Sequence, residues 1–209
     1  MRVFHFVNET FGLSDIAERR LKIARLHELN DPFEFLGVEL SNPGFRRAMK
    51  QSKETLSSTN GLLCFSRRWS NPVLWSHYAN KHQGICLGFD IPDAFLHPVS
   101  YVNSRFSAPE KADETFVRKL LFTKFAHWSY EDEYRVYEDL DTQENGMYFA
   151  DFSPEIALRQ VIVGCESTIS RAELSTALGT LAGEVEVFKA RAAFRSFRIV
   201  RNKNAALWV

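Results

Sequence analysis

The segment 61–91 constrains the fold most, because it encodes a strand, a helix and a second strand with very short connections. Residues 61–66 form an apolar run that begins at a glycine, as expected for a buried strand. Pro72 opens a helix that extends to about Asn80, since proline is tolerated at the first helical position. Residues 84–91 then return to strand character. This unit predicts a sheet that carries at least one helix.

The other segments extend the pattern to an α+β fold. Further strands are expected at 2–7, 21–26, 98–102, 133–138, 146–152, 159–163, 184–189 and 194–200. Further helices are expected at 15–20, 45–57, 109–124 and 170–181. The sequence contains no internal repeat, low-complexity tract or evident linker. We therefore expect residues 1–209 to form a single α+β domain of mostly antiparallel sheets with flanking helices.

Composition and charge narrow the function classes. Apolar residues make up 45% and charged residues 25% of the chain, which is typical of a globular protein. The 26 basic and 26 acidic residues give a formal net charge of zero, so bulk electrostatics does not attract polyanions and any nucleic-acid contact has to be local. No run is long and apolar enough for a membrane span or a signal peptide. We expect a soluble, cytoplasmic protein without a membrane partner.

The three cysteines lie far apart in apolar, strand-like runs. Cys64, Cys86 and Cys165 show no CxxC spacing. Spacing of this kind favours buried, reduced thiols in a cytosolic protein over zinc ligands or disulfides.

The segment 128–137 holds two acids two residues apart, next to an alternation of aromatic and β-branched residues. In a strand, Glu131 and Glu133 would project from the same face. Paired carboxylates repel, and their proximity raises one pKa toward the range that suits acid–base catalysis. The equally weighted structural alternative is an exposed edge strand whose acids meet Arg135 or nearby lysines.

The segment 75–84 places two histidines, two aromatic residues and a glycine at the end of a helix. Such a corner can build a pocket, because helix ends expose polar backbone groups and Gly84 permits a sharp turn. Trp75 and Tyr78 also have the spacing of an ordinary core stripe. His77 and His82 are five residues apart, which is poor spacing for a shared metal.

Two acids in the loop around Pro32 suggest a further alternative. Asp31 and Glu34 could join Glu131 and Glu133 in chelating a divalent cation, which would suit a metal-dependent nuclease. Nothing in the spacing requires a metal, so none is expected.

The C-terminal region is locally basic. Its cations alternate with Phe194 and Phe197, a mixture that suits phosphate contacts and base stacking. A solvated edge strand has the same appearance. The expected nucleic-acid-binding residues are Arg191, Arg195, Arg198, Arg201 and Lys203.

Several motifs together resemble a bacterial family, the domain of unknown function 2971. They are the segments 30–34 (NDPFE), 64–66 (CFS), 74–79 (LWSHYA), 82–90 (HQGICLGFD) and 128–135 (WSYEDEYR), which follow in the family's order. This resemblance covers most of the chain and implies no particular chemistry.

A second resemblance, to the ADP-ribosyltransferase superfamily, rests on a histidine in the first strand, a central aromatic or hydroxyl residue and a late glutamate. It implies a split two-sheet core in which His5 binds the adenosine ribose of NAD and Glu133 holds the nicotinamide ribose. Glu131 would be the additional catalytic acid. The resemblance further implies that Ser66, Trp75, Tyr78 and Arg135 line the NAD site.

These expectations lead to one hypothesis and two alternatives. The hypothesis is an NAD-dependent ADP-ribosyltransferase-like effector of a toxin or phage-defence system, in which Glu133 stabilises the oxocarbenium-like transition state. Its acceptor would be nucleic acid or protein, and a neutralising antitoxin would be a further partner. The alternatives are a non-catalytic binding module and the metal-dependent nuclease.

Overall fold

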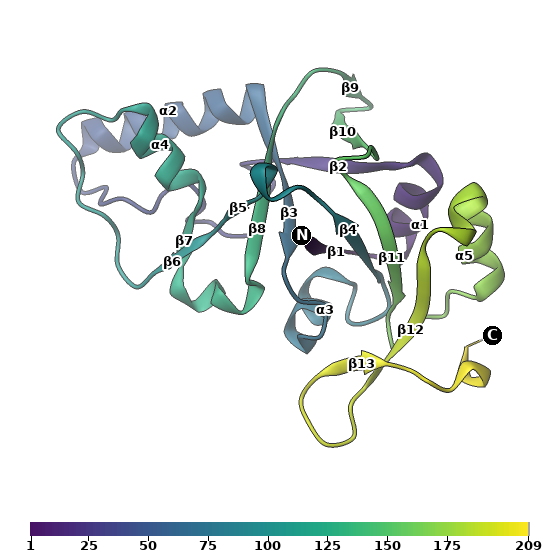
Figure 1. The fold of residues 1–209 in the computed structure, drawn as a ribbon. Coiled ribbons are helices and arrows are strands. Elements are labelled where there is room, and N and C mark those ends of the chain that lie inside the picture. The colour runs from purple at the N-terminus through teal and green to yellow at the C-terminus, as the bar shows by residue number, and fades with distance from the viewer. Residues whose placement is uncertain (209) are drawn as a thin grey trace. The chain divides into compact units, whose positions relative to one another are not determined.

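A computed structural model describes residues 1–208 and shows two compact units (Figure 1). Unit 1 comprises Met1–Leu21, Phe65–Asp93 and Asp151–Val209, of which Val209 lies outside the described residues. Unit 2 comprises Lys22–Cys64 and Ala94–Ala150. Each unit is therefore assembled from segments that are distant in the sequence.

Unit 1 is built on a mixed, mostly antiparallel sheet with the strand order β13-β12-β11-β4-β1. The strands are β1 (Arg2–Val7), β4 (Ile85–Asp90), β11 (Ala157–Val163), β12 (Glu186–Ala192) and β13 (Ile199–Arg201). The pairing of β11 with β12 is parallel, whereas β1–β4, β4–β11 and β12–β13 are antiparallel. The last residues of β3 (Asn60–Ser66) lie beside β1, with Phe4 opposite Ser66. The basic C-terminal strands thus form one end of this sheet.

Helices cover both faces of the unit 1 sheet, and the side-chain alternation of β1 shows which helix covers which face. Phe4 and Phe6 pack with Trp75 of α3 (Pro72–Tyr78). Val7 points to the other face, where Gly12 of α1 (Glu9–Glu18) lies against it. Helix α5 (Arg171–Leu178) packs beside α1 (Figure 1).

Unit 2 contains short strands and two helices around a separate apolar cluster. The strands are β2 (Arg20–Arg25), whose first two residues belong to unit 1, β5 (His97–Pro98), β6 (Ser100–Val102), β7 (Thr123–Phe125), β8 (Glu133–Asp139), β9 (Gln143–Glu144) and β10 (Met147–Asp151). The helices are α2 (Pro43–Thr59) and α4 (Glu114–Leu121). β8 pairs with β3 and β5, and β6 pairs with β7 in parallel. The core includes Leu26, Phe35, Met49, Leu62 and Leu120.

Short 3-10 helices complete the chain. They are η1 (Asp93–Phe95), η2 (Ala126–Glu131), η3 (Gly179–Gly183) and η4 (Ala205–Leu207). The expected α+β class with mostly antiparallel pairing is confirmed. The expected single domain 1–209 stays a prediction.

Several expected boundaries were wrong. Helix α1 begins at Glu9 instead of Asp15, because the Asn8 side chain caps it by accepting from the Phe11 N–H. Helix α4 begins only after Asp113, which caps it in the same way, and it ends before β7, a strand that the apolar pattern had merged into the helix. The expected strand 194–200 is mostly a loop, and β13 starts at Ile199.

The cysteines agree with expectation only in part. All three are free, and Cys86 is buried in β4, whereas Cys64 and Cys165 are half-buried. Burial raises the pKa of the Cys86 thiol, which makes it a core residue without thiolate character at neutral pH.

Candidate functional site

The loop 193–198 joins β12 to β13 and presents two aromatic rings to solvent. The Ala193 N–H donates to the Arg198 carbonyl over 2.9 Å, which closes the loop. Phe194 is 90% exposed and Phe197 98% exposed. Burying a phenylalanine side chain is worth about 1.5–3 kcal/mol, so two rings held out of the core offer a contact surface at some cost to the fold.

Arginines surround these two rings. The Arg191 guanidinium lies 4.2 Å from the centre of the Phe194 ring, in cation–π geometry. Arg198 donates to the Ser70 hydroxyl over 3.1 Å, which ties the loop to the segment before α3. Arg195 is exposed within the loop. We name Arg191, Phe194, Arg195, Phe197 and Arg198 the hairpin-loop cluster.

A hollow of about 590 Å³ lies against this loop within unit 1. Beside the loop residues, its walls include His82, Cys165 and Glu166. His82 ends a run of three residues, from Asn80, with positive φ values of 43–71°, a conformation that non-glycine residues rarely adopt. Burial lowers the pKa of His82, so the ring is neutral near pH 7. Within residues 1–208, its buried Nδ1 has no hydrogen-bond partner.

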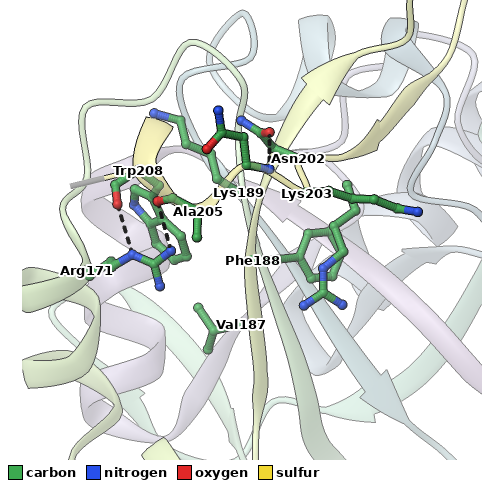
Figure 2. A pocket seen from close by; sticks show the side chains of 10 residues that line it. Arg171, Val187, Phe188, Lys189, Asn202, Lys203, Ala205 and Trp208 are labelled. Atoms are coloured by element: carbon green, nitrogen blue, oxygen red, sulfur yellow. Dashed lines mark hydrogen bonds between the residues drawn. The ribbon is translucent and has the colours of Figure 1, made fainter.

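A second cavity of about 370 Å³ lies at the base of the same hairpin (Figure 2). Its basic lining residues are Arg171, Lys189, Arg201 and Lys203, and among the described residues that line it none is acidic. The strand order explains the site, since β13 ends at Arg201 and the chain turns back toward α5, where Trp208 packs against Arg171.

The basic side chains of this cavity differ in how many hydrogen bonds and ion pairs they make with the protein. Arg171 donates to the Trp208 carbonyl, as Figure 2 shows, and its guanidinium lies 4.4 Å from that ring. Arg201 pairs with Glu186. Lys189 donates to the Ser167 carbonyl over 2.8 Å, and Lys203 has no hydrogen bond or ion pair within residues 1–208. We name Arg171, Lys189, Arg201 and Lys203 the basal cluster.

The five residues expected to bind nucleic acid therefore all lie on one hairpin and its continuation. Arg191, Arg195 and Arg198 belong to the hairpin-loop cluster, and Arg201 and Lys203 to the basal cluster. Sequence reasoning missed Arg171 and Trp208. Arg171 comes from α5, and no local pattern could indicate that it meets the C-terminal segment.

The acids of the segment 128–137 have a different environment, inside unit 2. Arg135 is fully buried and donates from Nη1 to Glu34 Oε1 over 2.6 Å, from Nη2 to Glu34 Oε2 over 2.9 Å and from Nε to Glu133 Oε1 over 2.9 Å. Nη1 also donates to the Leu121 carbonyl. Each ionic group in this arrangement therefore has direct partners, as a buried charge requires.

Glu131 and Glu133 converge, although they do not share a strand as expected. Glu131 ends η2, Asp132 has a left-handed φ of 45°, and Glu133 begins β8. Both carboxylates reach Lys124 Nζ, at 2.7 Å and 2.8 Å. The pair is thus brought together by a bend and a shared lysine.

The pKa rise expected for one carboxyl of this pair is not found at Glu133. Burial by itself would raise the pKa of this carboxyl, but the charges of Arg135 and Lys124 outweigh it and lower the pKa to about 2. Lys124 is correspondingly stabilised as a cation, and its pKa is raised despite burial. Glu133 is an ionised, well-paired carboxylate and has the wrong pKa for a general acid.

Lys124 also links this ionic group to a cavity within unit 2. The cavity measures about 300 Å³ and is mainly apolar, with Phe33, Phe125 and Arg105 among its other lining residues. The Arg105 guanidinium lies 5.2 Å from the centre of the Phe33 ring. This is a second place where a small molecule could be held next to a charged side chain.

The expected NAD-binding residues of unit 1 have separate environments. Trp75 is fully buried and donates to the Trp69 carbonyl, so its assignment to a cofactor site is corrected to a core role. Ser66 is buried and its hydroxyl is bonded in a turn with Arg68. His5 packs edge-on against Phe65, and Tyr78 lines an open cavity of about 550 Å³ with Asn8 and His77.

Arg135 requires the same correction as Trp75, because its complete burial against Glu34 and Glu133 leaves no surface for a pyrophosphate. His5, Ser66 and Tyr78 belong to unit 1, whereas Glu131 and Glu133 belong to unit 2. That these residues form one NAD pocket stays a prediction.

The acids considered for a metal have other partners. Glu34 is paired with Arg135, and Glu131 and Glu133 with Lys124. Asp31 accepts from the Phe33 N–H through Oδ1, and its buried Oδ2 has no partner within residues 1–208. In the described part of the chain, no three His, Cys, Asp or Glu side chains are grouped so that they could hold a metal ion.

Comparison with protein-family models, with curated proteins and with solved structures finds no match to this chain. The two family resemblances thus rest on the sequence motifs alone. Among residues 1–208, no helix has both the length and the apolar composition that a bilayer crossing needs.

Proposed function

We propose that this protein binds single-stranded nucleic acid through the hairpin-loop cluster. The observation that carries the proposal is the pair of almost fully exposed rings, Phe194 and Phe197, on a loop that also presents Arg195 and Arg198, with Arg191 beside it at the end of β12. Exposed aromatic rings stack on unpaired bases, and the arginines supply phosphate contacts and planar stacking surfaces. A duplex would keep its bases out of reach of such rings.

Local charge supports the same ligand. Between Glu186 and Lys203 the sequence has six basic residues and one acidic residue, although the whole chain is neutral. This hairpin and its continuation are therefore a local source of attraction for a polyanion. The loop contains no aliphatic residue larger than alanine, whereas a membrane-inserting loop usually combines its aromatic residues with leucine or isoleucine.

The test is a titration of fluorescently labelled single-stranded 12-mers by polarisation at fixed salt. The variant Phe194→Ala/Phe197→Ala should weaken binding by about 2–6 kcal/mol, because each base that loses a stacking partner costs about 1–3 kcal/mol. Phe11→Ala is the matched control, because Phe11 is a 60% exposed phenylalanine of the same unit outside the cluster. Its affinity should equal that of the wild type.

The contribution of the arginines to phosphate contacts is tested separately, through the salt dependence of binding. Replacing Arg191, Arg195 and Arg198 by glutamine should reduce the slope of log affinity against log salt by about 2, since each single-strand phosphate contact contributes about 0.7. Replacing Arg46, Arg47 and Lys50, three exposed basic residues of α2, removes the same charge and should leave the slope unchanged. Equal slopes in the two triple variants, or binding to anionic vesicles but not to oligonucleotides, would contradict the proposal.

ADP-ribosyl transfer from NAD is the second candidate. Two observations favour it: Lys124 holds the carboxylates of Glu131 and Glu133 together, and the same lysine lines the 300 Å³ cavity of unit 2. An anionic carboxylate is what the oxocarbenium-like transition state needs. For Glu133 to bind ribose hydroxyls, however, it would have to exchange contacts with Arg135 or Lys124.

This second candidate is tested by calorimetric titration with NAD and by nicotinamide release. Glu131→Gln should suppress nicotinamide release by at least about a hundredfold if Glu131 takes the acceptor's proton, because general acid–base catalysis contributes roughly 10²–10⁴. Glu144→Gln is the control at an exposed acid of the same unit. No heat of NAD binding would reject the transferase and leave the nucleic-acid proposal standing.

A further inference from the structure

We infer that the basal cavity of Figure 2 binds the terminal phosphate of a nucleic-acid strand. This inference rests on the proposed function, because it assigns the strand end to a site next to the hairpin-loop cluster. A phosphate group and part of its sugar require a cavity of a few hundred Å³, and the cavity measures about 370 Å³.

The charge of the cavity favours a group with more than one negative charge. Four basic side chains line it and, in the described part of the chain, Arg201 is the one with an acidic partner, Glu186. Lys203 has no ion-pair partner within residues 1–208. Lys189 donates one of its three N–H groups to the Ser167 carbonyl, which leaves two for a ligand. Within residues 1–208, three of these cations thus have no carboxylate partner. A terminal phosphate carries about 1.5–2 negative charges at pH 7, whereas an internal phosphodiester carries one.

The arrangement of donors is also suited to a phosphate. Arg171 is held in place by two carbonyls, those of Ala205 and Trp208, and by its contact with the Trp208 ring. A guanidinium fixed in this way loses little side-chain entropy on binding an oxyanion. Its Nη1 makes no hydrogen bond within residues 1–208 and can donate to a ligand. Asn202 and Asn204 also line the cavity with side-chain amides.

Basic residues of β12 lie between the cavity and the hairpin-loop cluster. Lys189 and Arg191 are two residues apart in this strand, so their side chains project from the same face, about 7 Å apart. Arg191 stacks on Phe194 at the loop, and Lys189 lines the cavity. A strand whose bases stack on the exposed rings can therefore follow a basic path to the cavity, where its end would lie.

The experiment compares three 12-mers of one sequence that differ only at their ends: a 5′-phosphate, a 3′-phosphate, and hydroxyls at both ends. The wild-type protein should bind one of the phosphorylated forms about tenfold more tightly than the hydroxyl form. Which end gains affinity identifies the direction of the strand. Equal affinity for all three would overturn the inference, and the hydroxyl form would still report on the hairpin-loop cluster.

Variants assign the gain to the cavity. Lys203→Gln, and Lys189→Gln/Lys203→Gln, should abolish the gain from the terminal phosphate, so that each variant binds the phosphorylated and hydroxyl forms with affinities that agree within about twofold. Lys81→Gln is the control, because Lys81 is an exposed lysine of unit 1 that lines neither cavity. Lys203 is exposed and makes no hydrogen bond or ion pair within residues 1–208, so Lys203→Gln should fold normally, which thermal unfolding verifies. A gain that persists in both variants would place the terminal phosphate elsewhere.

Titrations with inorganic phosphate and with a mononucleotide distinguish failure of the proposed function from failure of the phosphate site. If no oligonucleotide binds, the proposed function fails, but millimolar phosphate or adenosine monophosphate should still raise the melting temperature of the wild type and not of the double variant. If oligonucleotides bind and neither small ligand has this effect, with no gain from a terminal phosphate, the cavity is not a phosphate site.

Discussion

Arg135 and Glu34 form a two-pronged ion pair in the interior of unit 2, with Nη1–Oε1 and Nη2–Oε2 distances of 2.6 Å and 2.9 Å and no solvent exposure of either side chain. The two residues are 101 positions apart in the chain. Arg135 at the same time contacts Glu133, so a single guanidinium is shared by two acids. The segment that first suggested catalysis therefore has a central structural role.

Loss of this guanidinium should be severely destabilising. Arg135→Leu leaves Glu34 and Glu133 buried without their main partner, and we expect the free energy of unfolding to fall by about 3–5 kcal/mol. Arg159→Leu is the control, because Arg159 forms a 46% exposed pair with Asp90 and should cost no more than about 1 kcal/mol. Urea unfolding followed by circular dichroism measures both. Similar losses in the two variants would contradict a structural role for Arg135.

The ionised state of Glu133 predicts sensitivity to acid. Its pKa is lowered from 4.5 to about 2, so the folded state binds fewer protons than the unfolded state in this range. The stabilisation is complete above pH 4.5 and is lost as the pH falls toward 2. Unfolding free energies measured across this range should decrease, and Glu133→Gln should show a shallower decrease. An identical slope in that variant would assign the acid sensitivity to other carboxyls.

Asp15 should have the opposite pH dependence. Burial on α1 raises its pKa from 3.8 to about 7, with a further contribution from Glu18 and opposition from Arg20. The folded state therefore binds the additional proton, and stability falls as the pH rises from 3.8 to about 7. Asp15→Asn should remove this slope and be more stable than the wild type at pH 8 by roughly 1–2 kcal/mol. Asp141→Asn, at an exposed acid, should retain it.

Gly84 is required by close backbone contact. A Cβ atom at this position would lie 2.2 Å from the Val7 carbonyl oxygen, which belongs to the neighbouring strand and cannot move away easily. Gly84→Ala should lower the melting temperature by more than about 8 °C or prevent folding, because β1 and β4 would have to separate. Gly183→Ala places its Cβ in open space and should leave the melting temperature nearly unchanged. A small effect at both positions would mean that β4 begins differently.

Local sequence patterns predicted most elements of this fold and only part of its candidate sites. The strand at 133–138, the helix that opens at Pro72 and the capping box of Ser170 and Glu173 all follow from neighbouring residues. Helix starts at Asn8 and Asp113 were missed, because several residues could serve as caps and the apolar spacing did not distinguish them. The hairpin-loop arginines were recognised because their basic and aromatic character is itself local.

The sequence by itself determined the α+β class, the neutral charge with a basic C-terminal region, and the residues that alternate across each strand. Only the tertiary structure decided that Glu131 and Glu133 meet at Lys124, that Arg135 is enclosed by Glu34, and that Arg171 joins Lys189 and Lys203 around one cavity. The physical reason is that helix and strand periodicities act between near neighbours, whereas the pKa of a buried acid depends on charges that strand pairing brings from distant parts of the chain.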